Sequence, residues 1–197
     1  TGVQTCALPI CFYKINDTRD SRSRILNKRN GSYIKCLSGD TAQDGFMPYL
    51  ACVDEYHLHD TDEMYNVLLD GQAGLQNSLT VAITTAGKNL NGPCYKQYRY
   101  AKNVLEGVIK ADNLFIYIAE LDLPDSQRQE AEYHTALWDR ENWAQANPLL
   151  LYDDDYHVTK DENKWRKFTE IAEKAKLEGG TTENNFIIKK FFINRSY

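Results

Sequence analysis

The stretch Tyr49–Asp60 reads YLACVDEYHLHD, and the predicted fold is built outward from it. An apolar run ends there abruptly at two acids, Asp54 and Glu55. A short run of this kind is typical of a central strand in a parallel sheet, with both faces covered. In open α/β sheets, ligands bind beyond the carboxyl ends of the strands, which is where these acids stand. The sequence therefore predicts a ligand site at Asp54 and Glu55.

The two acids can perform different tasks, because adjacent residues of a strand point to opposite sides. Asp54 can hold a Mg²⁺ ion, largely through water, since Mg²⁺ keeps most of its hydration shell. Glu55 can orient a water molecule for attack on a terminal phosphate, and such acid–base assistance is worth about 10²–10⁴-fold in rate. This is the chemistry of a Walker B motif with a catalytic glutamate. The alternative is a strand that leaves the core and meets two solvated acids.

A second apolar run, Leu79–Thr84, leads into the sequence Thr84-Thr85-Ala86-Gly87. Hydroxyl groups at a neighbouring strand tip can hydrogen-bond a water at a phosphate site, or the two acids, and so report the state of a nucleotide. We also expect His57 to link the first strand tip to this loop. The alternative is a turn between strand and helix, in which the threonines cap the following segment.

The order of strands and helices is that of an α/β sheet with right-handed crossovers, followed after Pro124 by helices. Asn30-Gly31 predicts a hairpin, because both residues tolerate positive φ. The expected strands are the hairpin strands at Arg22–Lys28 and Ser32–Leu37, a strand at Leu114–Leu121, and a strand or linker at Phe186–Tyr197. Helices are expected at Asp62–Leu69, capped by Thr61, at Asn91–Glu106, ended by Gly107, and at Asp161–Glu178, with a helical pattern over Ala136–Ala146. The helix at Asp161–Glu178 is expected to carry Trp165, Phe168, Ala172 and Ala175 on one face.

Length and composition limit the class of protein. The chain has 197 residues, which suits one domain or one domain with a small appendage. With 42% hydrophobic and 26% charged residues it is expected to be globular, and no apolar run approaches the roughly 18 residues of a membrane helix. Five cysteines without a CxxC pair indicate reduced thiols. The formal net charge is −5, and the basic stretch within residues 12–35 is interpreted as a solvated hairpin face rather than a nucleic-acid patch.

Residues 1–10, TGVQTCALPI, resemble the in-frame translation of a sequencing-library adapter. They are excluded from the fold prediction, as an expression tag would be. An ordinary frayed terminus would lead to the same structural expectation. On the adapter interpretation, we expect further protein upstream.

Together, the strings DEYHLHD from Asp54, TTAG from Thr84 and NLNGPCY from Asn89 resemble the ATPase domain of tailed-phage terminase large subunits. The segment Glu141–Pro148 is similar to the "ENW…ANP" segment of that family. The resemblance implies an α/β fold with a partial, mostly parallel sheet of the P-loop ATPase type (additional strand, conserved glutamate) and a small helical C-terminal subdomain. With residues 1–10 set aside as an adapter artefact, the expected organisation is a partial ATPase core at 11–124, a helical linker or lid at 125–185, and at 186–197 the start of a connection to a nuclease domain.

The resemblance also implies a function, which is that of a DNA-packaging motor that couples ATP hydrolysis to translocation of double-stranded phage DNA. Asp54 matches the aspartate that holds Mg²⁺, and Glu55 matches the catalytic glutamate. Thr84, Thr85 and Gly87 match the coupling motif beside the nucleotide. The implied partners are the DNA, the portal protein, the small terminase subunit and further copies in a homo-oligomeric ring, with no membrane. The implied location is the host bacterial cytoplasm, transiently at the procapsid portal.

One expected motif is missing from the sequence. The family's phosphate-binding loop, of the type GxxxxGK[ST], does not occur, and the pair Gly87-Lys88 lies inside the coupling motif. We expect the loop upstream of residue 11 and the acids of an endonuclease domain downstream of residue 197. Because backbone N–H groups and the lysine of that loop supply most of the phosphate binding, this chain alone is expected to bind ATP weakly and to be inactive.

Two other functions fit parts of the pattern. The string Asp54-Glu55-Tyr56-His57 also fits a DExH-type helicase-like ATPase fragment. A non-catalytic remnant would only dock on DNA or on partner subunits. A transition-metal site at His57 and His59, with Asp62 or Glu63 as a third ligand, is less favoured than packing of both histidines around the strand tip.

Overall fold

The computed structural model describes residues 18–21, 24–27, 29–37, 45–123 and 130–193. Contacts within the chain divide it into two compact units, Thr1–Gln43 and Asp44–Tyr197. The adapter-like residues 1–10 and the end of the expected connection, 194–197, lie outside the described residues. In the part of the chain that is described, no helix is both long and apolar enough to cross a bilayer.

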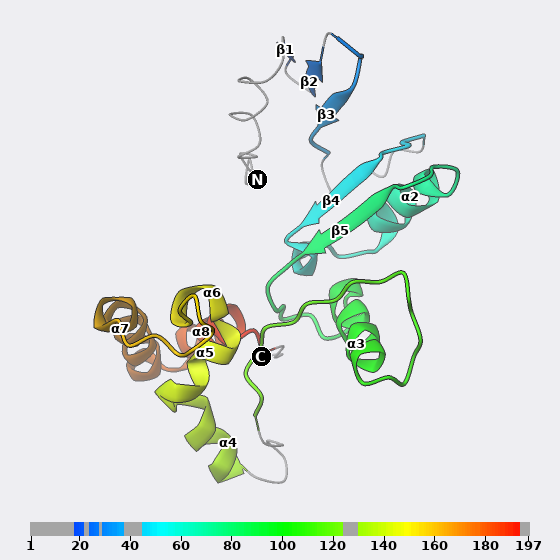
Figure 1. Ribbon diagram of the computed structural model, residues 1–197. Coiled ribbons are helices and arrows are strands. Elements are labelled where there is room, and N and C mark those ends of the chain that lie inside the picture. Colours follow the sequence, from blue (N-terminus) through cyan, green and yellow to red (C-terminus); the bar gives the residue numbers. More distant parts are fainter. Residues whose placement is uncertain (1–17, 22–23, 28, 38–44, 124–129, 194–197) are drawn as a thin grey trace. The chain divides into compact units, whose positions relative to one another are not determined.

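The first unit contains a three-stranded antiparallel sheet in the order β1-β2-β3 (Figure 1). Its strands are β1 (Thr18–Ser21), β2 (Arg24–Asn27) and β3 (Tyr33–Lys35). The backbone N–H of Asn27 donates to the carbonyl oxygen of Ser32 at 2.8 Å and closes the connection between β2 and β3. Gly31 there has a φ of 73°, in the left-handed region that glycine tolerates. The predicted hairpin is confirmed, and β1 is an additional strand that the sequence pattern did not predict.

The second unit is built around two parallel strands, β4 (Leu50–Asp54) and β5 (Leu79–Ile83), which are connected through helix α2 (Glu63–Gln72). In Figure 1 the two arrows lie side by side and run in the same direction. Their register pairs Asp54 with Ile83, so both strands end at the same edge of the sheet. A crossover of this length is needed because a short turn cannot join parallel strands. Both predicted strands are confirmed.

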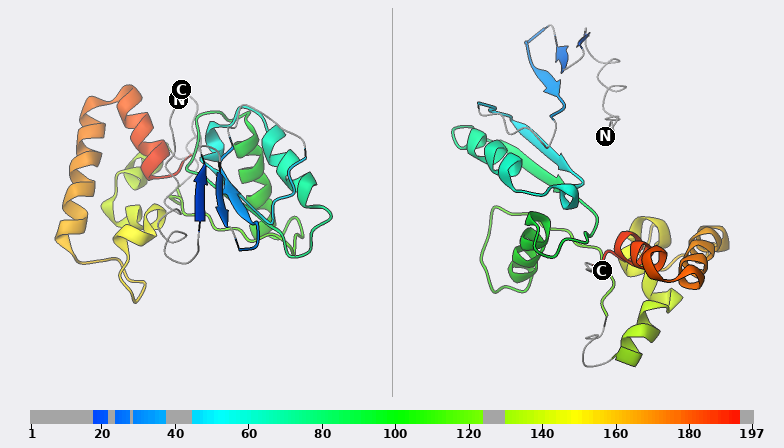
Figure 2. Two further views of the ribbon diagram at one scale, coloured as in Figure 1. Left: turned by 90° about the horizontal axis from the view of Figure 1, so that it is seen from above. Right: turned by 180° about the vertical axis from the view of Figure 1, so that it is seen from behind.

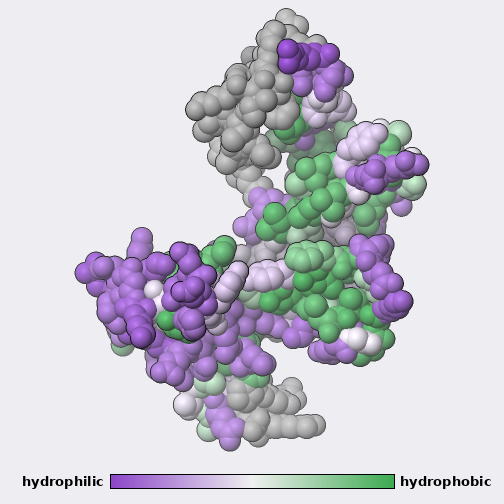
Figure 3. Space-filling model, in the orientation of Figure 1, coloured by the Kyte–Doolittle hydropathy of each residue, from purple (hydrophilic) through white to green (hydrophobic). Residues whose placement is uncertain are grey.

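One face of this sheet is covered by the described residues and the other is not. Ala51 and Val53 of β4 pack in a small core with Tyr56, Met64 and Leu68. Alternate residues of β4 are exposed, as in a strand with a single buried side. The exposed apolar side chains of the two strands include Leu50, Leu79 and Ile83. The expected cover on both faces is therefore absent from the described residues, and Figure 3 shows hydrophobic residues gathered over this part of the chain.

One buried side chain, Gln72, holds helix α2 on the sheet through hydrogen bonds to β5 and to the segment before β4. Its amide nitrogen donates to the carbonyl oxygens of Pro48 at 2.9 Å and Leu79 at 3.1 Å. Its amide oxygen accepts from the hydroxyl of Thr80 at 2.7 Å. The helix therefore continues past the predicted end at Leu69, because this last turn carries the contacts that hold it on the sheet. Its N-cap is Asp62 rather than the predicted Thr61.

Helix α3 (Pro93–Leu105) confirms the helix predicted from Asn91. Proline suits its first position because the missing N–H would have no partner there. Gly107, at a φ of 74°, follows the helix as predicted.

The strand predicted at Leu114–Leu121 is wrong, since the described residues form no strand there. Phe115 is 89% exposed and Tyr117 is 69% exposed, so the apolar run lacks a neighbouring strand to pair with and pack against. This segment is held instead through the carboxylate of Glu120. That carboxylate accepts hydrogen bonds from the Tyr98 hydroxyl at 2.7 Å and the Lys102 ammonium at 2.9 Å.

The rest of the second unit is helical, as the pattern after Pro124 predicts (Figure 2). Helix α7 is the longest helix in the described residues, and Asp161 caps it by accepting from the backbone N–H of Asn163 at 2.9 Å. Its predicted inner face, with Trp165, Phe168, Ala172 and Ala175, is confirmed as buried. The helical elements are α4 (Glu130–Leu137), the 3₁₀ turn η2 (Arg140–Asn142), α5 (Trp143–Ala146), α6 (Pro148–Leu151), α7 (Glu162–Glu178) and α8 (Gly180–Lys190).

Two helical predictions need correction. The pattern over Ala136–Ala146 is divided between α4, η2 and α5, because Asp139 starts a new turn by accepting from the backbone N–H of Glu141 at 3.0 Å. The segment from Phe186, predicted as a strand or linker, is helical as far as Lys190 because it belongs to α8. Phe186 and Ile187 are buried there against the aromatic core. Gly179, at a φ of 63°, makes the break between α7 and α8 possible.

Gly71 lies where α2 passes closest to the segment before β4, and a methyl group there would overlap the carbonyl oxygen of Phe46. We expect Gly71→Ala to lower the free energy of unfolding by about 1–3 kcal/mol, because backbone cannot move aside as a side chain can. Gly74→Ala is the matched control, since open space surrounds that position. Chemical denaturation measures both; equal stabilities of the two variants would contradict the prediction.

Candidate functional site

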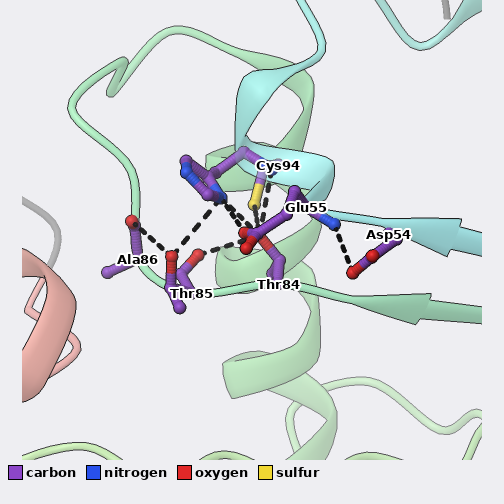
Figure 4. Close-up of polar contacts among 7 residues, drawn as sticks. Asp54, Glu55, Thr84, Thr85, Ala86 and Cys94 are labelled. Carbon is purple, nitrogen blue, oxygen red and sulfur yellow. Dashed lines mark hydrogen bonds and ion pairs between the residues drawn. The ribbon is translucent and has the colours of Figure 1, made fainter. Parts of the chain in front are cut away.

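The predicted site lies where β4 and β5 end together. Because Asp54 is paired with Ile83, the residues that follow each strand, Glu55 and Thr84, leave the sheet at the same place. The carboxylate of Asp54 is exposed and accepts a hydrogen bond from the backbone N–H of Glu55 at 3.0 Å. Figure 4 shows Glu55 turned toward Thr84 and Thr85, while the Asp54 carboxylate points away from them. The two acids thus face different surroundings, as predicted.

Glu55 adopts a left-handed backbone conformation, with a φ of 50° and a ψ of 48°. This conformation costs a residue with a side chain roughly 1–2 kcal/mol. The cause lies in the next residue, since Tyr56 is 2% exposed and fills the core beneath the strand end. The chain must turn sharply at Glu55 to bury Tyr56 and begin the 3₁₀ turn η1 (Tyr56–Leu58). Strain held by packing at such a position is typical of functional sites.

A single histidine connects the two strand ends. The backbone N–H of His57 donates to the hydroxyl of Thr84 at 3.0 Å, and its ring Nδ1 lies 3.0 Å from the same oxygen. Nδ1 also lies 3.2 Å from the Glu55 carboxylate and 3.5 Å from the Thr85 hydroxyl. The predicted link between the first strand tip and the threonine loop is present, and Figure 4 shows the polar contacts around it.

Gly87, the predicted site residue without a side chain, contributes its backbone to the site. A Cβ at this position would lie 3.0 Å from the Cβ of His57, so the loop backbone packs directly on the histidine. The structure therefore brings Glu55, Thr84, Thr85 and Gly87 together around His57, while the Asp54 carboxylate lies at the same strand end and contacts only the backbone N–H of Glu55 among the described residues.

Sequence reasoning missed two residues of the site. Tyr56 anchors the turn from inside the core, and its only signal was its place directly after the acids. Cys94, at the start of α3, places its thiol 3.8 Å from the Thr84 hydroxyl. Cys94 belongs to the NLNGPCY string, but nothing in that string assigns it to the strand tips, because the contact is set by where α3 packs.

Burial governs the electrostatics of these groups. It lowers the pKa of His57, an effect that the Glu55 carboxylate opposes and the Lys189 ammonium reinforces. Burial raises the pKa of Tyr56 to about 12, with a further contribution from Asp62. Burial also raises the pKa of the Cys94 thiol, which its hydrogen bond with Thr84 partly offsets. Near neutral pH, His57 is therefore a neutral ring beside the Glu55 carboxylate.

The donor set at the strand ends suits Mg²⁺ better than a transition metal. Mg²⁺ is ordinarily held by one or two carboxylates together with water and substrate phosphates, and Asp54 presents one exposed carboxylate. A protein cage for zinc would need a cluster of ligands, and the described residues contain no group of three or more histidine, cysteine or acidic side chains able to hold a metal. His59 packs against Tyr56 with the two rings tilted at 54° and their centroids 5.6 Å apart.

Comparison with known proteins decides which family this site belongs to. The family model described as "Terminase large subunit, ATPase domain" matches residues 9–103. This range contains both strands, the acids after β4, the loop after β5 and most of α3. This part of the chain belongs to the terminase large-subunit ATPase family.

Two known proteins are similar to this chain in fold or in part of its sequence. The fold is similar to "Crystal structure of the HK97 bacteriophage large terminase", with a TM-score of 0.60, at 17% sequence identity and over 90% of this chain. "Protein YmfN" of Escherichia coli (strain K12) is 44% identical over 82 residues, which is 42% of this chain. The chain spans 33% of the HK97 terminase chain and 18% of YmfN. At these identities and shares, the HK97 likeness shows the fold of the terminase segment and not its activity.

The strain at Glu55 can be measured by comparing two substitutions. Glycine adopts left-handed φ without penalty, so we expect Glu55→Gly to be about 1 kcal/mol more stable than Glu55→Ala. Lys96, exposed within α3, is the matched control, where alanine should be the more stable of the two by about 1 kcal/mol. Thermal or chemical denaturation gives both differences. An alanine variant at position 55 as stable as the glycine variant would show that the strain is not present.

The charge of Glu55 should be visible at His57. Because the carboxylate favours the protonated ring and so raises the pKa of His57, Glu55→Gln is expected to lower that pKa further. An NMR titration of the His57 ring follows the change. Asp112→Asn, which removes an exposed carboxylate paired with Lys110, is the control that should leave the His57 pKa where it was. A His57 pKa that rises or stays constant in Glu55→Gln would contradict the close contact between the two side chains.

Proposed function

We propose that this chain is part of a phage DNA-packaging motor, in which ATP hydrolysis is coupled to translocation of double-stranded DNA. The observation that supports it most directly is the pair of acids at the end of β4 beside the threonine loop at the end of β5, inside a segment of the terminase ATPase family. Parallel strands that deliver acids and hydroxyl groups to one edge form the water-activating half of a nucleotide site.

In this proposal each residue has one task. Asp54 holds Mg²⁺ through its exposed carboxylate, and the ion when bound would neutralise charge on the phosphates of ATP. Glu55 orients the attacking water and accepts its proton, since its carboxylate is turned to the loop side of the strand tip. Thr84 and Thr85 contact the same histidine as Glu55, and with Gly87 they form the segment that carries the state of the site to the rest of the protein.

The finer architecture is also part of the proposal. The parallel pair β4–β5 would belong to a larger P-loop ATPase sheet of the additional-strand, conserved-glutamate type. Residues 11–124 would form a partial ATPase core, 125–185 a helical linker or lid, and 186–197 the beginning of a connection to an endonuclease domain of the intact protein. The phosphate-binding loop is required for ATP binding and is not encoded in this sequence, so the proposed activity is that of the intact terminase.

The proposed partners follow from the motor. They are phage DNA, the portal protein, the small terminase subunit and further copies of the same chain in a ring. The proposed place of work is the host bacterial cytoplasm, with transient docking at the procapsid portal.

The test is ATP hydrolysis by an intact terminase that contains this segment. We expect Glu55→Gln to reduce kcat by about 10²–10⁴-fold, because the amide cannot accept a proton from water. Asp60→Asn is the matched control, since Asp60 is an exposed acid just beyond the same 3₁₀ turn and should leave kcat close to wild type. Hydrolysis at the wild-type rate in Glu55→Gln would overturn the assignment of Glu55.

The same preparation separates the competing functions. Packaging of DNA into procapsids that depends on Glu55 supports the motor. ATP-driven separation of DNA strands, without packaging, would favour the helicase-like alternative. DNA or subunit binding with no ATP hydrolysis in the wild-type intact protein would favour the non-catalytic remnant.

A further inference from the structure

The Thr84 hydroxyl is more fully engaged than a solvated side chain at a strand end would be. Its hydrogen is directed to the carbonyl oxygen of Thr85 at 2.9 Å. Its oxygen receives the backbone N–H of His57 at 3.0 Å, lies 3.8 Å from the Cys94 thiol and faces the ring Nδ1 at 3.0 Å. A hydroxyl has one hydrogen to donate, and with that hydrogen directed to Thr85 the contact between Thr84 and Nδ1 is a hydrogen bond when Nδ1 carries the proton.

The second neighbour of Nδ1 leads to the same conclusion. The Oε2 atom of Glu55 is buried and has no hydrogen-bond partner within the described residues. It lies 3.2 Å from Nδ1 of His57. An unprotonated Nδ1 would turn its lone pair toward this carboxylate oxygen, which is repulsive, whereas an Nδ1–H is attracted to it. A proton on Nδ1 therefore suits both neighbours: it can be donated to the Thr84 hydroxyl, and it lies in favourable electrostatic contact with the Glu55 carboxylate.

Packing against Gly87 and burial also restrict the His57 side chain. Gly87 packs so closely on His57 that an added Cβ would lie 3.0 Å from the histidine Cβ. The His57 side chain is only 15% exposed, so its ring has little space to turn away. The backbone bond from His57 to Thr84 fixes the main chain as well.

We infer that His57 is a positioning residue for the terminase reaction, which holds the Glu55 carboxylate to the Thr84–Gly87 loop through the proton on Nδ1. Glu55 is strained, and Oε2 has no hydrogen-bond partner within the described residues, so the direction of this carboxylate is set by the neighbouring ring. Movement of the loop is thereby transmitted to the residue that orients water. This inference rests on the proposed function of Glu55, although its structural part, the proton on Nδ1, does not.

The structural part is tested on this chain by NMR. In protein labelled with ¹⁵N, the neutral ring of His57 is expected to carry its proton on Nδ1, with Nε2 unprotonated. The signal is assigned from its loss in His57→Asn. The double variant Glu55→Gln with Thr84→Val removes both the carboxylate charge and the hydroxyl acceptor, and is expected to reduce the preference for Nδ1–H. A His57 ring protonated on Nε2 in the wild-type chain would overturn the inference, whatever the activity of the intact protein.

The positioning role is tested by kinetics on the intact terminase. We expect His57→Ala to lower kcat for ATP by about 10²-fold, the cost of a small misplacement of a catalytic group, with KM for ATP close to wild type. Asparagine can place its amide N–H near the position of Nδ1, whereas glutamine reaches further, to the position of Nε2. His57→Asn is therefore expected to restore most of kcat, and His57→Gln is not.

The outcomes separate this inference from the proposed function. A wild-type kcat in His57→Ala, with hydrolysis still abolished in Glu55→Gln, would overturn the positioning role and leave the ATPase assignment standing. Equal losses of kcat in the asparagine and glutamine variants would also overturn it, because a purely structural requirement for histidine does not distinguish the two amides. Rescue by asparagine alone supports it.

Discussion

The parallel pairing of β4 with β5 is the constraint on which the site depends. Register alone places the end of β4 beside the end of β5, so the acids and the threonine loop meet although 27 residues separate His57 from Thr84. The register is held by a single buried amide. Gln72 bonds the backbone before β4, the backbone of β5 and the hydroxyl of Thr80, and a slip of one residue would leave these bonds unmade inside the core.

The site is also a place where local preference and packing disagree. A left-handed glutamate is unfavourable in isolation, and the burial of Tyr56 beneath the strand end outweighs that cost. The disagreement is confined to one residue, and that residue is the proposed catalytic glutamate. Its carboxylate lies 3.2 Å from the His57 ring, which suits a group that must hold one position while water attacks a phosphate.

The terminase segment presents an unusual parallel sheet, because the described residues cover it on one side only. Parallel strands are generally covered on both faces, and here Leu50, Leu79 and Ile83 remain exposed. The apolar run at 114–121 is likewise left without a strand to pair with. By contrast, the helical elements enclose a complete aromatic core, in which Trp143 and Phe191 pack 5.7 Å apart and the indole of Trp143 donates to Leu137. The two regions thus differ in how much of their apolar surface the described residues cover.

The sequence by itself determined the features that depend on short-range pattern. These were both parallel strands, the α3 and α7 helices with their glycine ends, the buried face of α7, and the placement of two acids at the end of β4. It failed at Leu114–Leu121 and at Phe186, because an apolar run can form a strand, a helix or an irregular segment, and the available neighbours select among them. Only the tertiary structure decided the left-handed turn at Glu55, the role of Gln72 and the approach of Cys94 to Thr84. Each of these depends on contacts between residues distant in sequence, which no local pattern records.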